Sequence, residues 1–532
     1  MKSKIFLLLA ASLMVVSCNK ATPSSEAPKS SINDSSVVPA ASVSSDRGTS
    51  SEQKSSSAAP SSAKGSSSAK PSSSSTQPSS SSVQQSSSAQ PSSSSSASSS
   101  TQPVDEAYHA KVESMLLSDE EGKPIDVEFD VPKEYLSFAH KSTVFNKNLA
   151  IEALSFVAAA PYKEELARLY TYHSFDDIYY SEDYDKEQEK DSVLFSLAHK
   201  KIGNDDLVAL SLSGYNYQKQ WEQNLTIGKE GDHEGFMEGV TKVLPVFLDY
   251  LAKYNEPKVF VNGYSRTAAI ANLMSTFILD DKVVEESNYY AYLFETPKGV
   301  SVENTKEYKS IFNIVNSADL VTYVAPTEYG LKRVGVDIEL YSENADAKVS
   351  EYNEKLVLPA FTAKEADPED ASVPYFTNDI EFVNYVIKYL LEPITEVGEG
   401  QQNRDISTRA NFVDHIQGPA SYLVSLLFSL PSDVMDDLKT KLAAMSMWDM
   451  LGLLSTDGLY NFLAPVLTEH NFAFDDDKLK ANTNAAIELA TQKIALLLLF
   501  ASEDYKADFK RIIDFHALET VIPLVFALNT AE

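Results

Sequence analysis

Residues 258–273 read KVFVNGYSRTAAIANL and place a short buried strand directly before a helix. The strand part, 258–262, is rich in β-branched and aromatic side chains, and the run from 268 to 279 fits a helix. Gly263 and Ser265 stand in the turn between the two. Strands that pass into helices in this way build sheets covered by helices. This stretch therefore predicts an α/β fold, with the Ser265 hydroxyl pushed out above the carboxyl edge of the sheet.

The sequence on both sides of this turn supports the same fold class. A hairpin signal at 203–205 lies between two β-rich runs, and the alternation of strands and helices continues to about residue 340. This order predicts a mostly parallel, doubly wound sheet in a domain that spans 104–340. The expected elements are strands at 192–198, 207–212, 258–262, 289–294 and 311–315, and helices at 234–254 and 268–279.

The remaining residues, 341–532, have a different sequence pattern. Acidic, loop-like sequence extends to about 375, and mostly helical patterns follow to the end. We interpret this part as an insertion, a helical cap and a tail. The segment 484–502 contains five consecutive large apolar residues, but Glu488 and Lys493 interrupt it, so we expect a buried or interfacial helix and no membrane span.

The first 18 residues predict export and lipid anchoring. Lys2 and Lys4 precede a short apolar run, and Val15-Val16-Ser17-Cys18 resembles the lipobox of bacterial lipoproteins, in which the cysteine is acylated. The resemblance implies a protein that is lipid-anchored to the bacterial cell membrane and faces outward. The alternative is an incidental cysteine in an ordinary signal peptide. Cys18 is the only cysteine, which excludes an internal disulfide and a catalytic thiol.

Residues 19–103 are dominated by serine, with almost no large apolar side chains. Such a segment cannot bury enough surface to offset the entropy of ordering, so we predict a disordered tether. A mucin-like glycosylated stalk is the alternative. The net charge of −31 lies almost entirely in 104–532, and a surface of this sign repels nucleic acid and anionic headgroups.

Gly263-Tyr264-Ser265-Arg266-Thr267 stands in the context of a nucleophile elbow. Glycine two residues before the serine relieves crowding in the turn. Thr267 departs from the pattern Gly-x-Ser-x-Gly, so its β-branched side chain must be accommodated by small neighbours. Alanines at 268, 269 and 271 are small enough to do so.

Four segments in order resemble the class 3 lipases. Residues 261–273 are similar to the elbow and the helix after it. Residues 210–216, with a later Trp221 and Asn224, resemble the strand that ends in an oxyanion-hole turn. Residues 292–297 resemble a Phe-Gly-x-Pro strand end, with Glu295 where glycine is usual, and 311–321 resemble the strand and turn that carry the triad acid. The resemblance covers about 190–337 and implies an α/β-hydrolase that needs no cofactor.

The resemblance also implies a Ser-acid-His triad in this chain order. Asp319 matches the acid, and its alternative role is a turn-forming cap. Only His415, His470 and His516 follow it. The segment 414–422 is similar to the family's terminal segment, so we predict His415 as the base, with His516 as the alternative. Against His415, such lipases usually end soon after this histidine, whereas more than a hundred residues follow here.

The oxyanion donors would be backbone N–H groups of Arg266 and of Tyr215 or Asn216. His233 precedes the nucleophile, so we expect it at a helix start with Asp232 as the cap. The eight histidines are scattered, without the spacing of a metal site.

These observations predict a surface-anchored serine ester hydrolase that acts on acylglycerols, phospholipids or smaller esters through an acyl-enzyme. The expected partners are this lipid or ester substrate and the bacterial membrane that holds Cys18. The alternative is a binding or adhesion lipoprotein with a catalytically silent hydrolase fold. The departures at Thr267 and Glu295 keep that alternative open.

Overall fold

The structure is a computed structural model, and it describes residues 107–120, 123–186, 192–214, 220–363, 376–502 and 505–529. All of them belong to one compact unit that spans Asp105–Glu532. Cys18, the predicted signal sequence and the predicted tether lie outside the described residues.

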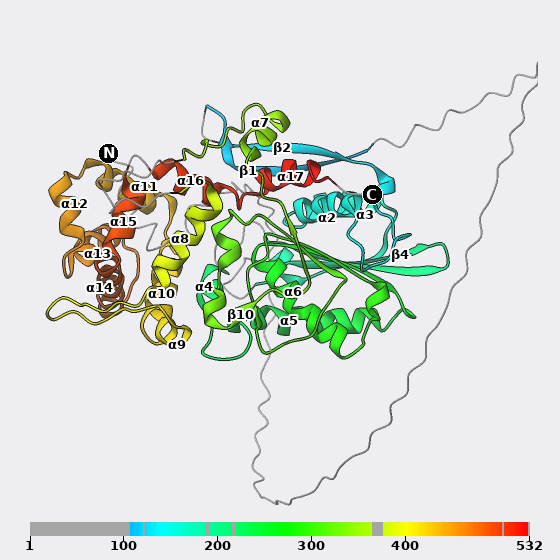
Figure 1. Cartoon of the computed structure of the whole chain (residues 1–532), viewed down its shortest axis with the longest axis horizontal. Coiled ribbons are helices and arrows are strands. Elements are labelled where there is room, and N and C mark those ends of the chain that lie inside the picture. Colours follow the sequence, from blue (N-terminus) through cyan, green and yellow to red (C-terminus); the bar gives the residue numbers. More distant parts are fainter. Residues whose placement is uncertain are drawn as a thin grey trace, which may run out of the picture. The chain divides into compact units, whose positions relative to one another are not determined.

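A seven-stranded sheet forms the core of the α/β part of this unit (Figure 1). Its strand order is β11-β9-β7-β6-β5-β4-β3. Neighbouring strands from β5 to β11 pair in parallel, whereas β4 and β3 continue the sheet antiparallel. The predicted mostly parallel sheet is thus confirmed. The strands are β3 (Asp176–Tyr180), β4 (Phe195–Ile202), β5 (Asp205–Leu212), β6 (Lys258–Tyr264), β7 (Tyr289–Phe294), β9 (Ile311–Val315) and β11 (Val336–Glu339).

All five predicted strands are present, and β7 and β9 have the predicted bounds. Gly203 has a φ of +62°, as the predicted hairpin between β4 and β5 requires. The edge strands β3 and β11 were not predicted. β11 has only four residues, and none of its side chains is buried, so it lacks the apolar run that marks the central strands.

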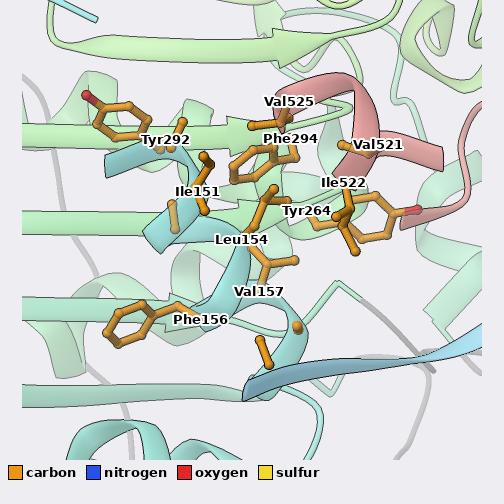
Figure 2. Close-up of a cluster of buried hydrophobic side chains, with 14 of the residues drawn as sticks. Ile151, Leu154, Phe156, Val157, Tyr264, Tyr292, Phe294, Val521, Ile522 and Val525 are labelled. Carbon is orange, nitrogen blue, oxygen red and sulfur yellow. The ribbon is translucent and has the colours of Figure 1, made fainter. Parts of the chain in front are cut away.

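Side chains alternate along each central strand and form two separate cores. One face packs against α2 (Lys147–Ala159) and α17 (Leu518–Phe526). Figure 2 shows this face, where Leu154 of α2 and Ile522 of α17 lie among the aromatic rings of the central strands. Every residue of α2 from Leu149 to Ala159 is buried, because sheet, hairpin and helices enclose it.

The opposite face packs against α5 (Glu234–Leu251) and α6 (Arg266–Asp280). These helices precede and follow β6 in the chain. α5 and α6 approach closely at Gly239, where a Cβ would lie 2.5 Å from the Ile270 side chain. This close packing holds the first residues of α6 at the carboxyl end of β6, where the Ser265 turn lies.

Smaller elements complete the α/β part. They are the hairpin β1 (Tyr108–Ser118) and β2 (Pro124–Val131), the pair β8 (Val300–Ser301) and β10 (Leu331–Lys332), and helices α3 (Lys163–Tyr172) and α4 (Trp221–Leu225).

Between β11 and α17 the described chain is largely helical, which confirms the prediction of helices after about residue 375, whereas one helix also lies in the stretch 341–375 that the sequence predicts as loop-like. Its helices are α7 (Ala345–Tyr352), α8 (Asp379–Leu391), α9 (Arg409–Phe412), α10 (Gly418–Ser429), α11 (Ser432–Ala444), α12 (Met447–Leu453), α13 (Gly458–Glu469), α14 (Asp476–Gln492), α15 (Ile494–Ala501) and α16 (Lys506–Asp514). The last helix, α17, returns to the sheet and packs on α2, α7 and β1.

The apolar segment 484–502 is divided between α14 and α15, with Lys493 at the break. The Lys493 ammonium donates to the carbonyl oxygens of Tyr389 at 2.8 Å and Glu392 at 2.6 Å. Within the described residues, no helix combines the length and the apolar character that crossing a bilayer requires.

Candidate active site

The turn between β6 and α6 has the backbone of a nucleophile elbow. Ser265 caps α6 with a φ of 55° and a ψ of −130°, a conformation that is strained for any residue with a Cβ. Its N–H donates to the Phe294 carbonyl oxygen at 2.9 Å, which fixes the turn to the end of β7. A Cβ at Gly263 would lie 3.0 Å from the Thr267 carbonyl oxygen, so glycine allows the helix to start this close to the strand.

Thr267 is accommodated by a glycine just after the neighbouring strand as well as by its small neighbours. Its hydroxyl donates to the Tyr264 carbonyl oxygen at 3.0 Å, inside the turn. Gly214, just beyond β5, faces this group: a Cβ there would lie 2.8 Å from Thr267 Oγ1 and would overlap the Tyr264 carbonyl oxygen. The threonine in place of the usual glycine is therefore compatible with the elbow.

Gly214→Ala is expected to disrupt the elbow, because the added methyl group would collide with the backbone of β6, which cannot move away. We expect a loss of about 2 kcal/mol or more in the free energy of unfolding, measured in urea, and loss of activity. Gly418→Ala in α10 is the matched control, since φ is −61° and a Cβ there meets nothing within 4 Å. Equal stability of the two variants would contradict this account of the turn.

His516 lies beside Ser265. Its Nε2 is 2.8 Å from Ser265 Oγ, and its Nδ1 is 2.6 Å from Asp319 Oδ2. The side chains are almost completely enclosed, with exposed fractions of 1% for Ser265, 4% for His516 and 0% for Asp319. The Tyr264 hydroxyl donates to the His516 carbonyl oxygen, and the two rings stack. The residue before the serine thus holds the histidine in place.

The prediction of His415 as the base is wrong. His415 lies in a π-helical turn, Val413–Gln417, and its carbonyl oxygen accepts from Arg404 at 3.4 Å. This turn packs in the helical part, whereas the imidazole beside Ser265 is that of His516. The third histidine, His470, lies between Asp433 and Asp437 of α11.

A local similarity caused this error. The spacing from His415 to Tyr422 resembles the family's terminal segment, yet Tyr422 packs with α13 and α14 side chains of the insertion. The signal that favoured His516 was its position late in the chain. It stands just before an apolar helix, α17, all of whose residues except Phe526 are buried.

Asp319 occupies both of the positions that the sequence left as alternatives. Oδ2 faces the imidazole, while Oδ1 accepts the N–H of Val321 at 2.8 Å and caps the short helix η5 (Leu320–Tyr323). The cap fixes the carboxylate, so that its second oxygen remains available to orient the histidine.

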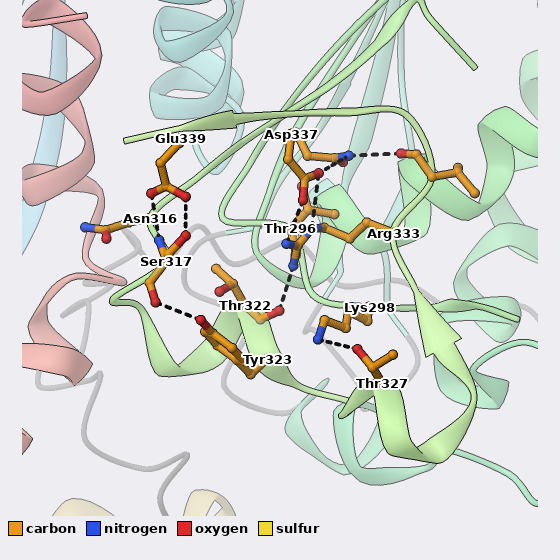
Figure 3. A network of polar contacts seen from close by, with 12 residues as sticks. Thr296, Lys298, Asn316, Ser317, Thr322, Tyr323, Thr327, Arg333, Asp337 and Glu339 are labelled. Atoms are coloured by element: carbon orange, nitrogen blue, oxygen red, sulfur yellow. Dashed lines mark hydrogen bonds and ion pairs between the residues drawn. The ribbon is translucent and has the colours of Figure 1, made fainter. Parts of the chain in front are cut away.

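The turn that carries Asp319 is braced from β11 and the preceding loop (Figure 3). The Ser317 N–H donates to the Glu339 carboxylate at 3.0 Å, and the Tyr323 hydroxyl donates to the Ser317 carbonyl oxygen at 3.0 Å. Arg333 donates to the Thr322 carbonyl oxygen at 2.7 Å and also pairs with Asp337. The insertion adds support, because α16 packs against η5.

Of the two predicted oxyanion donors, one can be placed. Arg266 is the first residue of α6, so its N–H lies at the positive end of the helix, directly after Ser265. Its side chain is buried and donates to Gln223 of α4, the helix that contains the Trp221 and Asn224 of the resemblance. Tyr215 and Asn216 lie outside the described residues, although Gly214 before them is adjacent to the elbow.

His233 is at a helix start, as predicted, but it caps α5 itself. Its Nδ1 accepts the Phe236 N–H at 3.3 Å, and burial lowers the pKa of the imidazole to about 3. The expected cap, Asp232, instead accepts the N–H of Ser301 at 2.7 Å. The described residues include no group of three or more His, Cys, Asp or Glu side chains that could hold a metal ion.

A serine, a histidine and an aspartate in this geometry at the carboxyl edge of a parallel sheet define an α/β-hydrolase of the serine type. Residues 204–329 match the family described as Lipase (class 3). This segment is thus similar to the class 3 lipases, a family of ester hydrolases.

Comparison with solved structures finds fungal lipases. A fungal lipase in an inhibitor complex is 16% identical, with coverage of 36% of this chain and 78% of the lipase and a TM-score of 0.30. The triacylglyceride lipase of Rhizomucor miehei is 15% identical, with coverage of 38% and 83% and a TM-score of 0.30. The lipase of Rhizopus microsporus var. chinensis is 16% identical, with coverage of 40% and 82% and a TM-score of 0.27. No curated protein matches the chain.

Proposed function

We propose that Ser265 is the nucleophile, His516 the general base and Asp319 the residue that orients the base. The observation that carries this proposal is the continuous path from Ser265 Oγ through both nitrogens of His516 to Asp319. With Nδ1–H donated to the carboxylate, Nε2 can accept the serine proton.

In the proposed reaction, Ser265 Oγ attacks the ester carbonyl while its proton passes to His516. The tetrahedral oxyanion is stabilised by the Arg266 N–H and by a backbone N–H that follows Gly214. The imidazolium then protonates the leaving alcohol, which departs as the acyl-enzyme forms. Water activated by His516 attacks the acyl group, and Ser265 regains its proton as the carboxylic acid leaves.

We further propose that the substrates are acylglycerols, phospholipids or smaller esters. The class 3 lipase segment supports a lipid or simple ester. The net charge of −31 favours a neutral substrate over an anionic one, because like charges repel at the surface. A panel of glycerides, zwitterionic and anionic phospholipids and short-chain esters, assayed at one ionic strength, would rank these classes.

A fluorophosphonate probe tests the proposed nucleophile without knowledge of the substrate. The probe phosphonylates an activated serine, and mass spectrometry of the digested protein identifies the modified residue. We expect modification at Ser265 of the full chain. Absence of labelling in the folded protein would instead support the alternative of a binding protein with a silent hydrolase fold.

We also propose that acylated Cys18 anchors the protein to the outer face of the bacterial cell membrane. The support is the lipobox-like Val15-Val16-Ser17-Cys18 and the serine-rich sequence that follows it. A diacylglyceryl group carries two chains, which is sufficient for stable anchoring, whereas one chain binds only reversibly.

Cys18→Ser is expected to move the protein from the membrane fraction to the soluble fraction, because it removes the atom that would be acylated. Fractionation of expressing cells, with immunoblotting of both fractions, measures the distribution. Ser17→Ala, which keeps a small residue before the cysteine, is the control that should remain membrane-bound. If Cys18→Ser stays with the membrane, the anchor lies elsewhere.

A further inference from the structure

Glu295 lies beneath the proposed triad, at a position where the class 3 lipases usually have glycine. It follows β7 with a φ of 45°, a left-handed conformation that glycine adopts without cost. The preceding carbonyl, of Phe294, receives the Ser265 N–H. A residue with a long ionisable side chain therefore occupies a strained backbone position directly behind the elbow.

The Glu295 carboxyl is enclosed and points to the end of β9. Its exposed fraction is 0%, and Oε2 accepts the Asn316 N–H at 3.1 Å. The Asp319 carboxyl, which is itself fully buried, is the nearest acidic neighbour that acts on it, and the two side chains are close enough to interact. Among the described residues, Glu295 Oε1 has no hydrogen-bond donor. An ionised Glu295 would leave this oxygen as a buried anionic atom without a partner.

The charges around Glu295 also oppose its ionisation. Asp319 and Glu339 of β11 both act on it, and both are acidic. Burial and the charge of Asp319 hold the pKa of Glu295 well above its usual range. The imidazole of His516 faces Asp319 and not Glu295. Two buried carboxyls next to one histidine favour a state in which one carboxyl keeps its proton.

We propose that Glu295 is a positioning residue that donates a hydrogen bond, as a neutral carboxylic acid, to the Asp319 carboxylate. Asp319 then receives three donors: Glu295 O–H, the Val321 N–H and the His516 Nδ1–H. The added donor withdraws charge from Asp319, so that it stabilises the imidazolium of His516 less strongly. The base thereby remains neutral, and able to accept the serine proton, at a lower pH.

This inference rests on the proposed function, but its first test does not require turnover. The infrared difference spectrum between native protein and Glu295→Gln at pH 7 should contain the carbonyl stretch of a protonated carboxyl group, lost in the variant. Asp514, also a buried carboxyl group with a raised pKa, supplies the control variant Asp514→Asn, which should leave this band in place. Loss of carboxylate bands alone on Glu295→Gln would overturn the proposal.

The second test compares pH profiles of kcat/KM. Glu295→Gln retains an N–H donor toward Asp319, so its acid limb should coincide with that of the native enzyme. Glu295→Met has a similar size and no donor, so the acid limb should move to higher pH by about 0.5 to 1 unit. At pH values below the acid limb, this shift lowers kcat/KM of Glu295→Met about three- to tenfold relative to the native enzyme.

Each contrary result has a distinct meaning. If Glu295→Gln moves the acid limb to lower pH, a negative charge has been removed, and Glu295 is ionised in the native enzyme. If neither variant moves the limb, Glu295 only fills space. If neither variant is active while the infrared band is present in the native protein, an NMR titration of the His516 ring in the same variants replaces the kinetic profile. Activity that is independent of Ser265 would refute the proposed function without affecting the band.

Stability supplies a further readout with a defined sign. The folded pKa of Glu295 lies above its unfolded value, so folding takes up a proton at neutral pH. The stability that Glu295 contributes is present below its unfolded pKa and is lost as the pH rises toward its folded pKa. The urea midpoint of Glu295→Gln should therefore increase relative to the native protein between pH 5 and pH 8. A difference that is constant with pH would contradict a protonated Glu295.

Discussion

Ser265→Ala is expected to lower ester hydrolysis by roughly three orders of magnitude or more and to abolish fluorophosphonate labelling. The physical reason is that Oγ supplies the electron pair that forms the acyl-enzyme, and the alanine methyl group cannot. Folding should be retained, because the side chain is small and the turn is fixed by the backbone hydrogen bond from the Ser265 N–H to the Phe294 carbonyl oxygen. Initial rates with a short-chain ester and labelling of the same samples measure both effects.

Ser432→Ala provides the matched control. Ser432 is an exposed serine at the first position of a helix, α11, and it lies in the insertion. We expect native rates and native labelling from this variant. Labelling that persists in Ser265→Ala would assign the nucleophile to another residue, and an unfolded Ser265→Ala protein would show that the elbow depends on the serine for its stability.

His516→Ala is expected to reduce turnover about as far as Ser265→Ala does. Without the imidazole, the serine proton has no acceptor, and Asp319 is left as a buried carboxylate without its ring partner. Residues that act as a unit lose activity together, so the double variant should be little worse than either single variant. Steady-state rates of the three variants under one set of conditions test this non-additivity.

His415→Ala and His470→Ala are the controls for this prediction. Both residues belong to the helical insertion, and His470 is paired with exposed or half-buried carboxylates of α11. We expect rates within about threefold of the native value, because a surface pair contributes at most about 1 kcal/mol and neither histidine faces Ser265. A loss with His415→Ala equal to that with Ser265→Ala would restore the original assignment of the base.

Much of the fold could be predicted because the central strands are buried on both faces. Runs such as Tyr289–Phe294 and Ile311–Val315 are mostly apolar, with Asn313 as the exception in the second, and polar residues bound them, so their limits are readable. The edge strands were missed for the opposite reason. In β3 and β11 no side chain is buried, and the pairing that makes them strands comes from the neighbouring strand.

The site was predictable where its residues are close in sequence to a strand end. Ser265 and Asp319 each follow a buried strand, and that context identifies them. His516 follows a helix and is positioned by long-range contacts with Tyr264 and Asp319, which no local pattern encodes. Glu295 was noticed as a departure from the family, but its contact with Asp319 depends on the register of β7 and β9.

The insertion between β11 and α17 has a consequence for the order of folding. Ser265 and His516 are 251 residues apart in the chain, and Asp319 and His516 are 197 residues apart. Closing so long a loop costs entropy before any contact is gained, and such contacts form late. The sheet can thus assemble while the protein is still inactive, and the appearance of activity during refolding would report the arrival of α17 on the sheet.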